Sequence, residues 1–265
     1  MLNRNKAQIK KSKRVLILYI LLRVSVVLVM IAQYFRGSYE NMFLCGLTLL
    51  LFTLPAFVEK KAHVRLPESL EIIVLLFIFA AEILGEIHAF YINIPLWDSM
   101  LHTTTGFLAA AVGFCLVDLL NRHTHESKKL SPFYLALMAF CFSMTIGVLW
   151  EFFEFAMDFF MGMDMQKDTI VYSINTTFLD PSKSNQIVHI GNIKDLVING
   201  QRIPIDGYLD IGLIDTMKDM FVNFIGAFVF SVIGYIFLRD KKEDGIATRL
   251  IPVVEDDDED DNDDM

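Results

Sequence analysis

The sequence predicts an all-α protein, a polytopic membrane helix bundle of about six transmembrane helices, with a small extracytoplasmic β-hairpin loop and a disordered acidic C-terminal tail. Its 265 residues are 54% hydrophobic and include 23 Phe. The mean hydropathy of +0.46 is too high for a typical soluble domain. In addition, its apolar runs approach or exceed the roughly 20 residues that cross a bilayer core of ~30 Å.

The predicted spans follow one another along the chain and define a transmembrane domain at 15–240. The second span is short. The fifth is long, so we expect it to tilt or to extend past the membrane interface. The six runs are 15–34, 42–58, 68–91, 98–120, 132–161 and 213–238.

Positively charged residues near the span ends predict the orientation of the bundle. Lys and Arg are frequent in residues 1–14, a basic cytoplasmic N-terminus, and in the segments after the second, fourth and sixth spans. Both termini should therefore be cytoplasmic, and the loop at 162–212 should be extracytoplasmic. In that loop, β-forming residues flank Asn199-Gly200, which is typical of a type I′ turn, so we expect a small hairpin.

The C-terminal segment 241–265 is predicted to be a cytoplasmic, disordered tail. Residues 255–264 carry nine acidic groups, and without them the formal net charge of −9 becomes zero. Such a run repels itself and stays solvated. A role in buffering cations or docking a partner is the alternative, and we assign the tail no chemistry.

Familiar catalytic motifs are absent from the sequence. It contains no nucleophile elbow, H-E-x-x-H, Gly-rich phosphate loop or Cys-x-x-Cys. Its three cysteines, Cys45, Cys115 and Cys141, all fall within predicted spans, which argues against a disulfide framework or a Cys-rich metal site. We predict a lipid bilayer as the surroundings and no nucleic-acid partner.

Acidic and histidine side chains recur at about one-turn spacing inside the apolar runs. A charge at the bilayer centre costs about 2.5–3.5 kcal/mol on insertion scales, so such residues usually face the bundle interior or a wet cavity. The predicted orientation puts them all in the outer half of the membrane, where we expect one polar site open to the outer leaflet. On the third to sixth spans in turn, these residues are Glu82, Glu86 and His88; Asp98 and His102; Glu151, Glu154 and Asp158; and Asp215, Asp219 and Asn223.

The spacing of these residues permits more than one interpretation. Asp98 and His102 share a helix face, so the carboxylate could orient the imidazole as a general base or metal ligand; otherwise Asp98 caps the helix. Glu151 and Glu154 resemble the paired carboxylates that bind metal ions in helical bundles, although the His of the Glu-x-x-His pattern is missing. Otherwise the two glutamates share a proton and clamp neighbouring helices together.

Two polar residues fit this site less well. His88 would lie nearly opposite Glu86 if the helix continued that far. Arg23 lies near the middle of the first span, about 14 Å from its cytoplasmic end by helical rise, too deep to reach the surface easily. It neutralises a buried carboxylate, binds an anionic head group or bonds a backbone carbonyl, and the sequence leaves these alternatives open.

Three segments on successive spans, WDSMLHTTTG, WEFFEFAMD and DTMKDMFVNFIGA, resemble the YjdF-type family of uncharacterised bacterial inner-membrane proteins. The resemblance covers about residues 70–238 and implies a bacterial inner (cytoplasmic) membrane location and a set of site residues, but no reaction. Phe155, where the family tends to have Trp, and the longer 162–212 loop depart from the pattern. The residues that carry the resemblance are Asp98, His102, Gly106, Glu151, Glu154, Asp215, Asp219, Gly226 and Ala227. A looser likeness to the VanZ-like family rests on Asp98, His102, Asp219, Asn223 and Gly226, although Ser99 stands where that family has Lys.

These observations lead to three functional hypotheses. The first is a membrane enzyme that uses a divalent metal ion against a lipid-linked or cell-envelope substrate. The second is a proton- or cation-coupled transporter, and the third is a non-catalytic assembly protein; the oligomeric state stays open. The catalytic candidates are His102, Glu151, Glu154 and Asp219; the predicted metal ligands are these four and Asp215; the other polar site residues are Glu86, His88, Asp98, Asp158, Asn223 and Arg23.

Overall fold

The computed structural model describes residues 13–62, 64–122, 129–240, 250–251 and 253–254. Within them the chain divides into two compact units. The first unit contains the residues up to Gly147 and those from Val222 onward, and the second unit is Val148–Phe221. Two unbroken helices, α7 (Pro132–Met161) and α8 (Leu213–Asp240), each contribute residues to both units.

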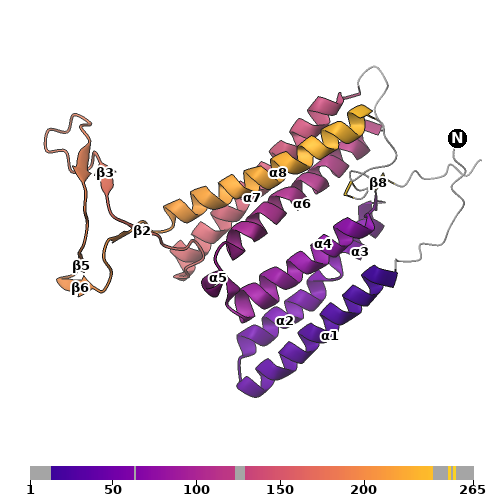
Figure 1. Cartoon of the computed structure of the whole chain (residues 1–265), viewed down its shortest axis with the longest axis horizontal. Coiled ribbons are helices and arrows are strands. Elements are labelled where there is room, and N and C mark those ends of the chain that lie inside the picture. The colour runs from indigo at the N-terminus through magenta and orange to yellow at the C-terminus, as the bar shows by residue number, and fades with distance from the viewer. Residues whose placement is uncertain (1–12, 63, 123–128, 241–249, 252, 255–265) are drawn as a thin grey trace, which may run out of the picture. The chain divides into compact units, whose positions relative to one another are not determined.

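The first unit begins with helical segments that lie side by side (Figure 1). They are α1 (Lys13–Arg36), α2 (Tyr39–Leu51) followed by α3 (Leu54–Ala62), and α4 (Glu68–Phe79) continued by the π-helix η1 (Ala80–Ile87). Apolar side chains on the facing sides of these helices pack into a common core, as expected for helices that bury one stripe. The buried members of this core are Val15, Leu22, Val26, Cys45, Phe52, Leu75, Ile78 and Ile83.

The second predicted span contains a helix break that the apolar pattern did not reveal. Proline has no backbone N–H and its ring crowds the carbonyl four residues earlier, so Pro55 prevents α2 from continuing. The N–H of Thr53 donates to the carbonyl of Leu50 at 2.9 Å, three residues back. The carbonyl of Leu49 instead accepts a hydrogen bond from Arg23 Nη2 at 3.3 Å.

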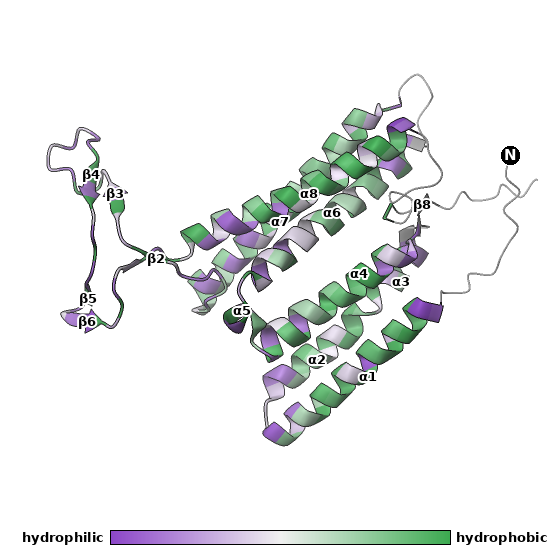
Figure 2. Cartoon of the chain, viewed as in Figure 1, coloured by the Kyte–Doolittle hydropathy of each residue, from purple (hydrophilic) through white to green (hydrophobic). Residues whose placement is uncertain are grey.

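Five helical segments in the described part of the chain are long and apolar enough to cross a membrane. Figure 2 shows hydrophobic residues along each of the long helices. The remaining predicted span, 68–91, is helical from Glu68 to Ile87 but consists of 12 residues of α4 and 8 of η1, neither of which is long enough alone. The protein is therefore a polytopic helical membrane protein, as predicted. The five segments are Lys13–Arg36, Tyr39–Lys61, Trp97–Asn121, Pro132–Met161 and Leu213–Asp240.

The first unit is completed by α5 (Phe90–Asn93), α6 (Trp97–Arg122) and the parts of α7 and α8 within it. Small residues at this core let the helices approach closely, so that the ring of Phe230 packs edge-on against Phe107 and Phe114. The buried members of this second core are Leu70, Ala110, Ala111, Phe114, Ala139, Ala227, Phe230 and Ile251.

Part of the C-terminal segment is folded onto the first unit. Ile251 is buried in the second core, and β8 (Val253–Val254) pairs antiparallel with β1 (Val64–Arg65). Within the segment 241–265, which was predicted as a tail, Ile251 therefore packs into the core of this unit. The acidic residues 255–264 lie outside the described residues.

The second unit consists of the end of α7, a loop with short strands and the beginning of α8. Three antiparallel pairs form within the loop: β2–β7, β3–β4 and β5–β6. Asn199 and Gly200 join β5 to β6 with φ values of 54° and 78°, both positive as a type I′ turn requires, so the predicted hairpin is confirmed. The strands are β2 (Ile170–Val171), β3 (Ile174–Thr176), β4 (Val188–Ile190), β5 (Leu196–Ile198), β6 (Gln201–Ile203) and β7 (Tyr208–Leu209).

Candidate functional site

Helices α6, α7 and α8 meet in the first unit at Asn223, whose side chain is 1% exposed. Its Nδ2 donates to the Sδ atom of Met144 at 3.7 Å. A Cβ atom added at Gly106 would collide with the backbone carbonyl of Asn223, and one added at Gly147 would lie 2.6 Å from its Nδ2. Glycine at both positions thus allows three helices to close around one buried amide.

Two further contacts hold these helices in register. Ser143 Oγ on α7 donates to the carbonyl of Gly106 at 2.7 Å. Gly226 on α8 lies against the backbone of Thr103, where a side chain would have no room. Hydroxyl hydrogen bonds and small residues of this kind are typical of membrane helix interfaces. In the first unit they set which faces of α6, α7 and α8 point toward one another.

The same face of α6 carries two predicted site residues. His102 and Asp98 lie four and eight residues before Gly106, and His102 Nε2 is 3.5 Å from Asp98 Oδ1. The helix begins at Trp97, so Asp98 lies in its first turn and is not the cap residue before it. The contact fits a carboxylate that orients the imidazole ring.

The polar face of α8 continues in the second unit. Asp219 and Asp215 lie four and eight residues before Asn223, which puts all three on one face of an unbroken helix. Asp219 is as deeply buried as Asn223, at 1% exposed. Asp219 and Asn223 are therefore shielded from both lipid and water, whereas Asp215 is partly exposed.

The end of α7 separates carboxylates from aromatic rings. Glu151 lies four residues after Gly147 and Glu154 three residues further, and their side chains are only 4% and 8% exposed. The indole Nε1 of Trp150 donates to Glu154 Oε1 at 2.8 Å, which holds that carboxylate in one orientation. Exposed apolar rings cover the other faces, as expected against lipid; they are Trp150, Phe152, Phe153, Phe155, Phe159 and Phe160.

Asp158, a predicted polar site residue, binds the backbone of the loop that follows α7. Its Oδ1 accepts the N–H of Met165 at 2.6 Å, and its Oδ2 accepts the N–H of Gln166 at 2.8 Å. The side chain of Gln166 in turn donates to Thr216 Oγ1 on α8 at 2.6 Å. Asp158 thus fixes the segment that connects the end of α7 to the start of α8.

Asp215, a predicted metal ligand, bonds the same segment from the α8 side. Its Oδ2 accepts the N–H of Lys167 at 2.8 Å, and Lys218 Nζ lies 3.8 Å from its Oδ1. Gly212, just before α8, leaves space for this arrangement, because a Cβ there would lie 2.7 Å from the Cβ of Gln166. Asp158 and Asp215 together tie residues 165–167 to both helices.

Asp210 is a structural residue of this unit that the sequence analysis missed. Its Oδ1 accepts the N–H of Thr169 at 2.7 Å, and its Oδ2 accepts the N–H of Ile214 at 2.8 Å. Burial raises the pKa of this carboxyl, but the N–H groups of Thr169, Ile214 and Gly212 outweigh burial and lower the pKa below its usual value. An acidic residue shortly before an apolar helix is a recognised signal of a helix start and could have indicated it.

The remaining predicted residues lie on other helices of the first unit. Glu86 belongs to η1, and His88 follows its last residue and donates from Nδ1 to the carbonyl of Ile83 at 2.8 Å. Arg23 donates to the carbonyl of Leu49, which is one of the three alternatives open for it. The Leu49 carbonyl lies near the end of α2, where carbonyl groups commonly lack an intrahelical donor, whereas the Ile83 carbonyl also accepts the N–H of His88 at 3.1 Å.

A family model described as "Predicted membrane protein (DUF2238)" matches residues 15–240, most of the chain. The chain belongs to this family of predicted membrane proteins. It is also similar to an uncharacterised protein of Thermotoga maritima, 29% identical over 104 residues, which are 39% of this chain and 52% of that protein. The chain thus spans about half the length of that relative. No solved structure matches. The narrower YjdF-type name and the bacterial inner-membrane location stay predictions.

Proposed function

We propose that this membrane protein binds a divalent metal ion through His102 and the buried carboxylates of α7 and α8, and uses it in a reaction on a lipid-linked or cell-envelope substrate. Imidazole and carboxylate groups together suit several divalent transition metals. When bound, such an ion lowers the pKa of a coordinated water molecule and polarises a substrate oxygen. The proposed ligands are His102, Glu151, Glu154 and Asp219, four of the five that the sequence predicts.

The main support for this proposal is the burial of ionisable groups on helix faces that continue from the Asn223 contact. Glu151, Glu154 and Asp219 are each less than a tenth exposed. A carboxylate withdrawn from water needs a proton, a hydrogen-bond donor or a cation. A divalent ion is a cation that several buried carboxylates can share, beside donors they already have such as the Trp150 indole.

Within this proposal, the other acidic residues position the site. Asp98 orients His102 through the 3.5 Å contact. Asp158 and Asp215 hold the loop between α7 and α8, because their oxygen atoms accept backbone N–H groups. We therefore propose that Asp215, although it was a predicted ligand, acts through the N–H of Lys167 and not through the ion.

Metal analysis of the purified full-length protein tests the proposal. We expect about one divalent ion per chain after purification without chelators, and a Tm that falls when a chelator removes it. Glu154→Gln should release the ion, whereas the same change at the exposed Glu86 should retain it. A protein without bound metal, or a Tm that divalent ions leave unchanged, would remove the hypothesis.

A proton- or cation-coupled transporter is the alternative, supported by the run of Asp215, Asp219 and Asn223 along one face of α8. Ionisable residues inside membrane spans often mark such relays. Flux measurements in proteoliposomes separate the two hypotheses. Glu151→Gln and Asp219→Asn should abolish flux through a relay, and unchanged flux excludes a relay.

If the substitutions lower stability and change nothing else, the third hypothesis, an assembly protein, is favoured.

A further inference from the structure

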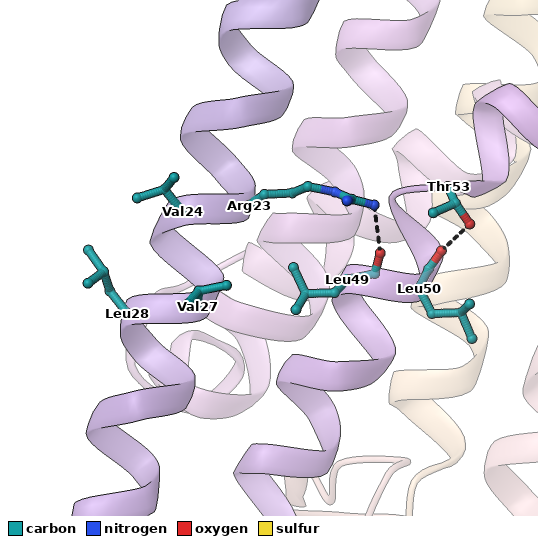
Figure 3. Close-up of a pocket in the computed structure, with 7 residues that line it drawn as sticks. All are labelled: Arg23, Val24, Val27, Leu28, Leu49, Leu50 and Thr53. Carbon is teal, nitrogen blue, oxygen red and sulfur yellow. Dashed lines mark hydrogen bonds between the residues drawn. The ribbon is translucent and has the colours of Figure 1, made fainter.

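Arg23 lies beside a groove between α1 and α2 in the first unit, on helices that take no part in the candidate site (Figure 3). The groove has a volume of ≈ 580 Å³, within the roughly 300–1,000 Å³ usual for small-molecule sites. Its other lining residues are Val24, Val27, Leu28, Leu49, Leu50 and Thr53. The groove is thus apolar except for one hydroxyl group and one guanidinium group.

The helix break in the second span anchors Arg23 at this groove. Pro55 ends α2, and Nη2 of Arg23 bonds the carbonyl of Leu49 at 3.3 Å, as the dashed line in Figure 3 marks. The guanidinium carbon lies 4.5 Å from the centre of the Tyr19 ring. These contacts engage only some of the five N–H donors of the Arg23 guanidinium group. Its Nε is buried and has no hydrogen-bond partner among the described residues.

The depth of Arg23 restricts what could bind to it. The 24 residues of α1 are roughly 36 Å long, and Arg23 lies roughly 15 Å from the first of them, near the middle of the span. Phospholipid head groups stay at the surface of the ~30 Å hydrocarbon core. A long-chain carboxylic acid, by contrast, can enter the core in its uncharged form and avoids the cost of moving an ion into hydrocarbon.

We propose that this groove binds a long-chain carboxylic acid from the membrane, with its carboxyl group at Arg23 and its hydrocarbon chain along α1 and α2. The planar guanidinium fork matches the two oxygen atoms of a carboxylate. Val24, Leu28 and Leu50 are exposed and provide apolar surface for the chain. The acid therefore enters the core protonated and ionises when its carboxyl group reaches the guanidinium group, whose positive charge favours the carboxylate, and the released proton passes to water at the membrane surface.

Binding of a fluorescent long-chain carboxylic acid to the full-length protein in nanodiscs of zwitterionic lipid tests this proposal. The alcohol of the same chain length serves as the uncharged probe. The wild-type protein should bind the acid roughly tenfold more tightly than the alcohol, because only the carboxylate forms an ion pair with the guanidinium group and offers it two acceptor oxygen atoms. Arg23→Gln should abolish that preference. Equal binding of acid and alcohol by the wild-type protein overturns the proposal.

A second variant keeps Arg23 and fills the groove. Val24→Phe should weaken binding of both probes, whereas Val112→Phe on α6 should leave binding unchanged; the two valines are similarly exposed, at 51% and 49%. Thermal melting verifies that each variant is folded. Acid binding that Val24→Phe does not affect overturns the proposal.

Two other occupants correspond to outcomes of the same experiment. Displacement of the probe by an anionic phospholipid, but not by an unlabelled fatty acid, would assign the groove to a lipid head group and overturn the proposal. A protein that binds no probe but forms a dimer that Arg23→Gln dissociates would assign the groove to a second copy of the chain, with the same consequence.

Discussion

Asn223 is a buried amide whose neighbours on two other helices are glycine residues. In a bilayer the hydrophobic effect does not drive helices together, so close packing and interhelical hydrogen bonds decide which faces meet. Gly106 and Gly147 supply the space, and Ser143 supplies a hydrogen bond to the Gly106 carbonyl. At the scale of single residues, the absence of a side chain at two glycine positions determines this contact as much as the polar side chains do.

Gly106→Ala should destabilise the protein, because the new Cβ would collide with the backbone carbonyl of Asn223, which no rotamer change can relieve. We expect the free energy of unfolding to fall by about 1–3 kcal/mol. Gly46→Ala in α2 is the matched control, since nothing lies within 4 Å of its Cβ position. That change should be neutral or stabilising by about 0.5–1 kcal/mol. Denaturation in detergent measures both, and equal effects would contradict the role of Gly106.

The elements of the second unit depend on carboxylates that bind backbone N–H groups. Asp158 holds residues 165 and 166 at the end of α7, and Asp210 holds the first turn of α8. Asp180 does the same within the loop between β3 and β4: its Oδ2 accepts the N–H groups of Ser184 and Gln186 at 2.8 and 3.1 Å. Short strands contribute little stability by themselves. The loop therefore depends on the hydrogen bonds that these acidic residues accept.

The loop around Asp180 should lose structure only in strong acid. The Ser182 hydroxyl, together with the N–H groups of Gln186, Ser182 and Ser184, lowers the pKa of this carboxyl to about 2. The pKa of an unfolded Asp is about 3.9, so its contribution to stability is complete above about pH 4 and is lost as the pH falls through about 2.

Hydrogen exchange at Ser184 and Gln186, corrected for intrinsic exchange rates, measures this effect. Protection should decline between about pH 4 and pH 2, and Asp180→Asn should weaken protection above about pH 4 and remove its pH dependence. Asp206→Asn, at an exposed position, is the control and should leave the profile unchanged. Protection that already declines well above pH 4 would contradict the lowered pKa.

At the scale of the whole molecule, the distribution of charge along the chain predicts how it lies in a membrane. Basic residues flank the start of α1, occur at the end of α3 and just after it in EKKAHVR, and precede α7 in NRHTHESKK. Such clusters remain on the cytoplasmic side. The loop between α7 and α8 should then be on the opposite side, together with the ends of those helices that carry the buried carboxylates.

Cysteine labelling in intact cells tests this orientation. Ser184→Cys in the loop should react with a membrane-impermeant maleimide, whereas Ser131→Cys, just before α7, should react only after the cells are opened; both positions are exposed. The background protein should lack Cys141, which is exposed, while Cys45 and Cys115 are buried. The reverse labelling pattern would contradict the predicted orientation.

Most of the fold was predictable because it depends on local properties of the chain. Apolar runs predicted the long helices, and Asn199-Gly200 predicted the hairpin. The change to a π-helix after Phe79 and the packing of Ile251 onto the bundle were not predictable in this way. Both lie in apolar sequence, where the hydrophobic pattern alone does not distinguish helix types or identify the partner of a buried side chain.

The sequence by itself determined that this is a helical membrane protein and which polar residues share a helix face, since one-turn spacing is a property of each helix alone. Only the tertiary structure decided what those side chains bond. Asp158 and Asp215 bind loop N–H groups, and Arg23 binds a carbonyl at the break before Pro55. Such partners are backbone groups that helix ends leave unsatisfied, and which side chain reaches them depends on the distance between segments far apart in the chain.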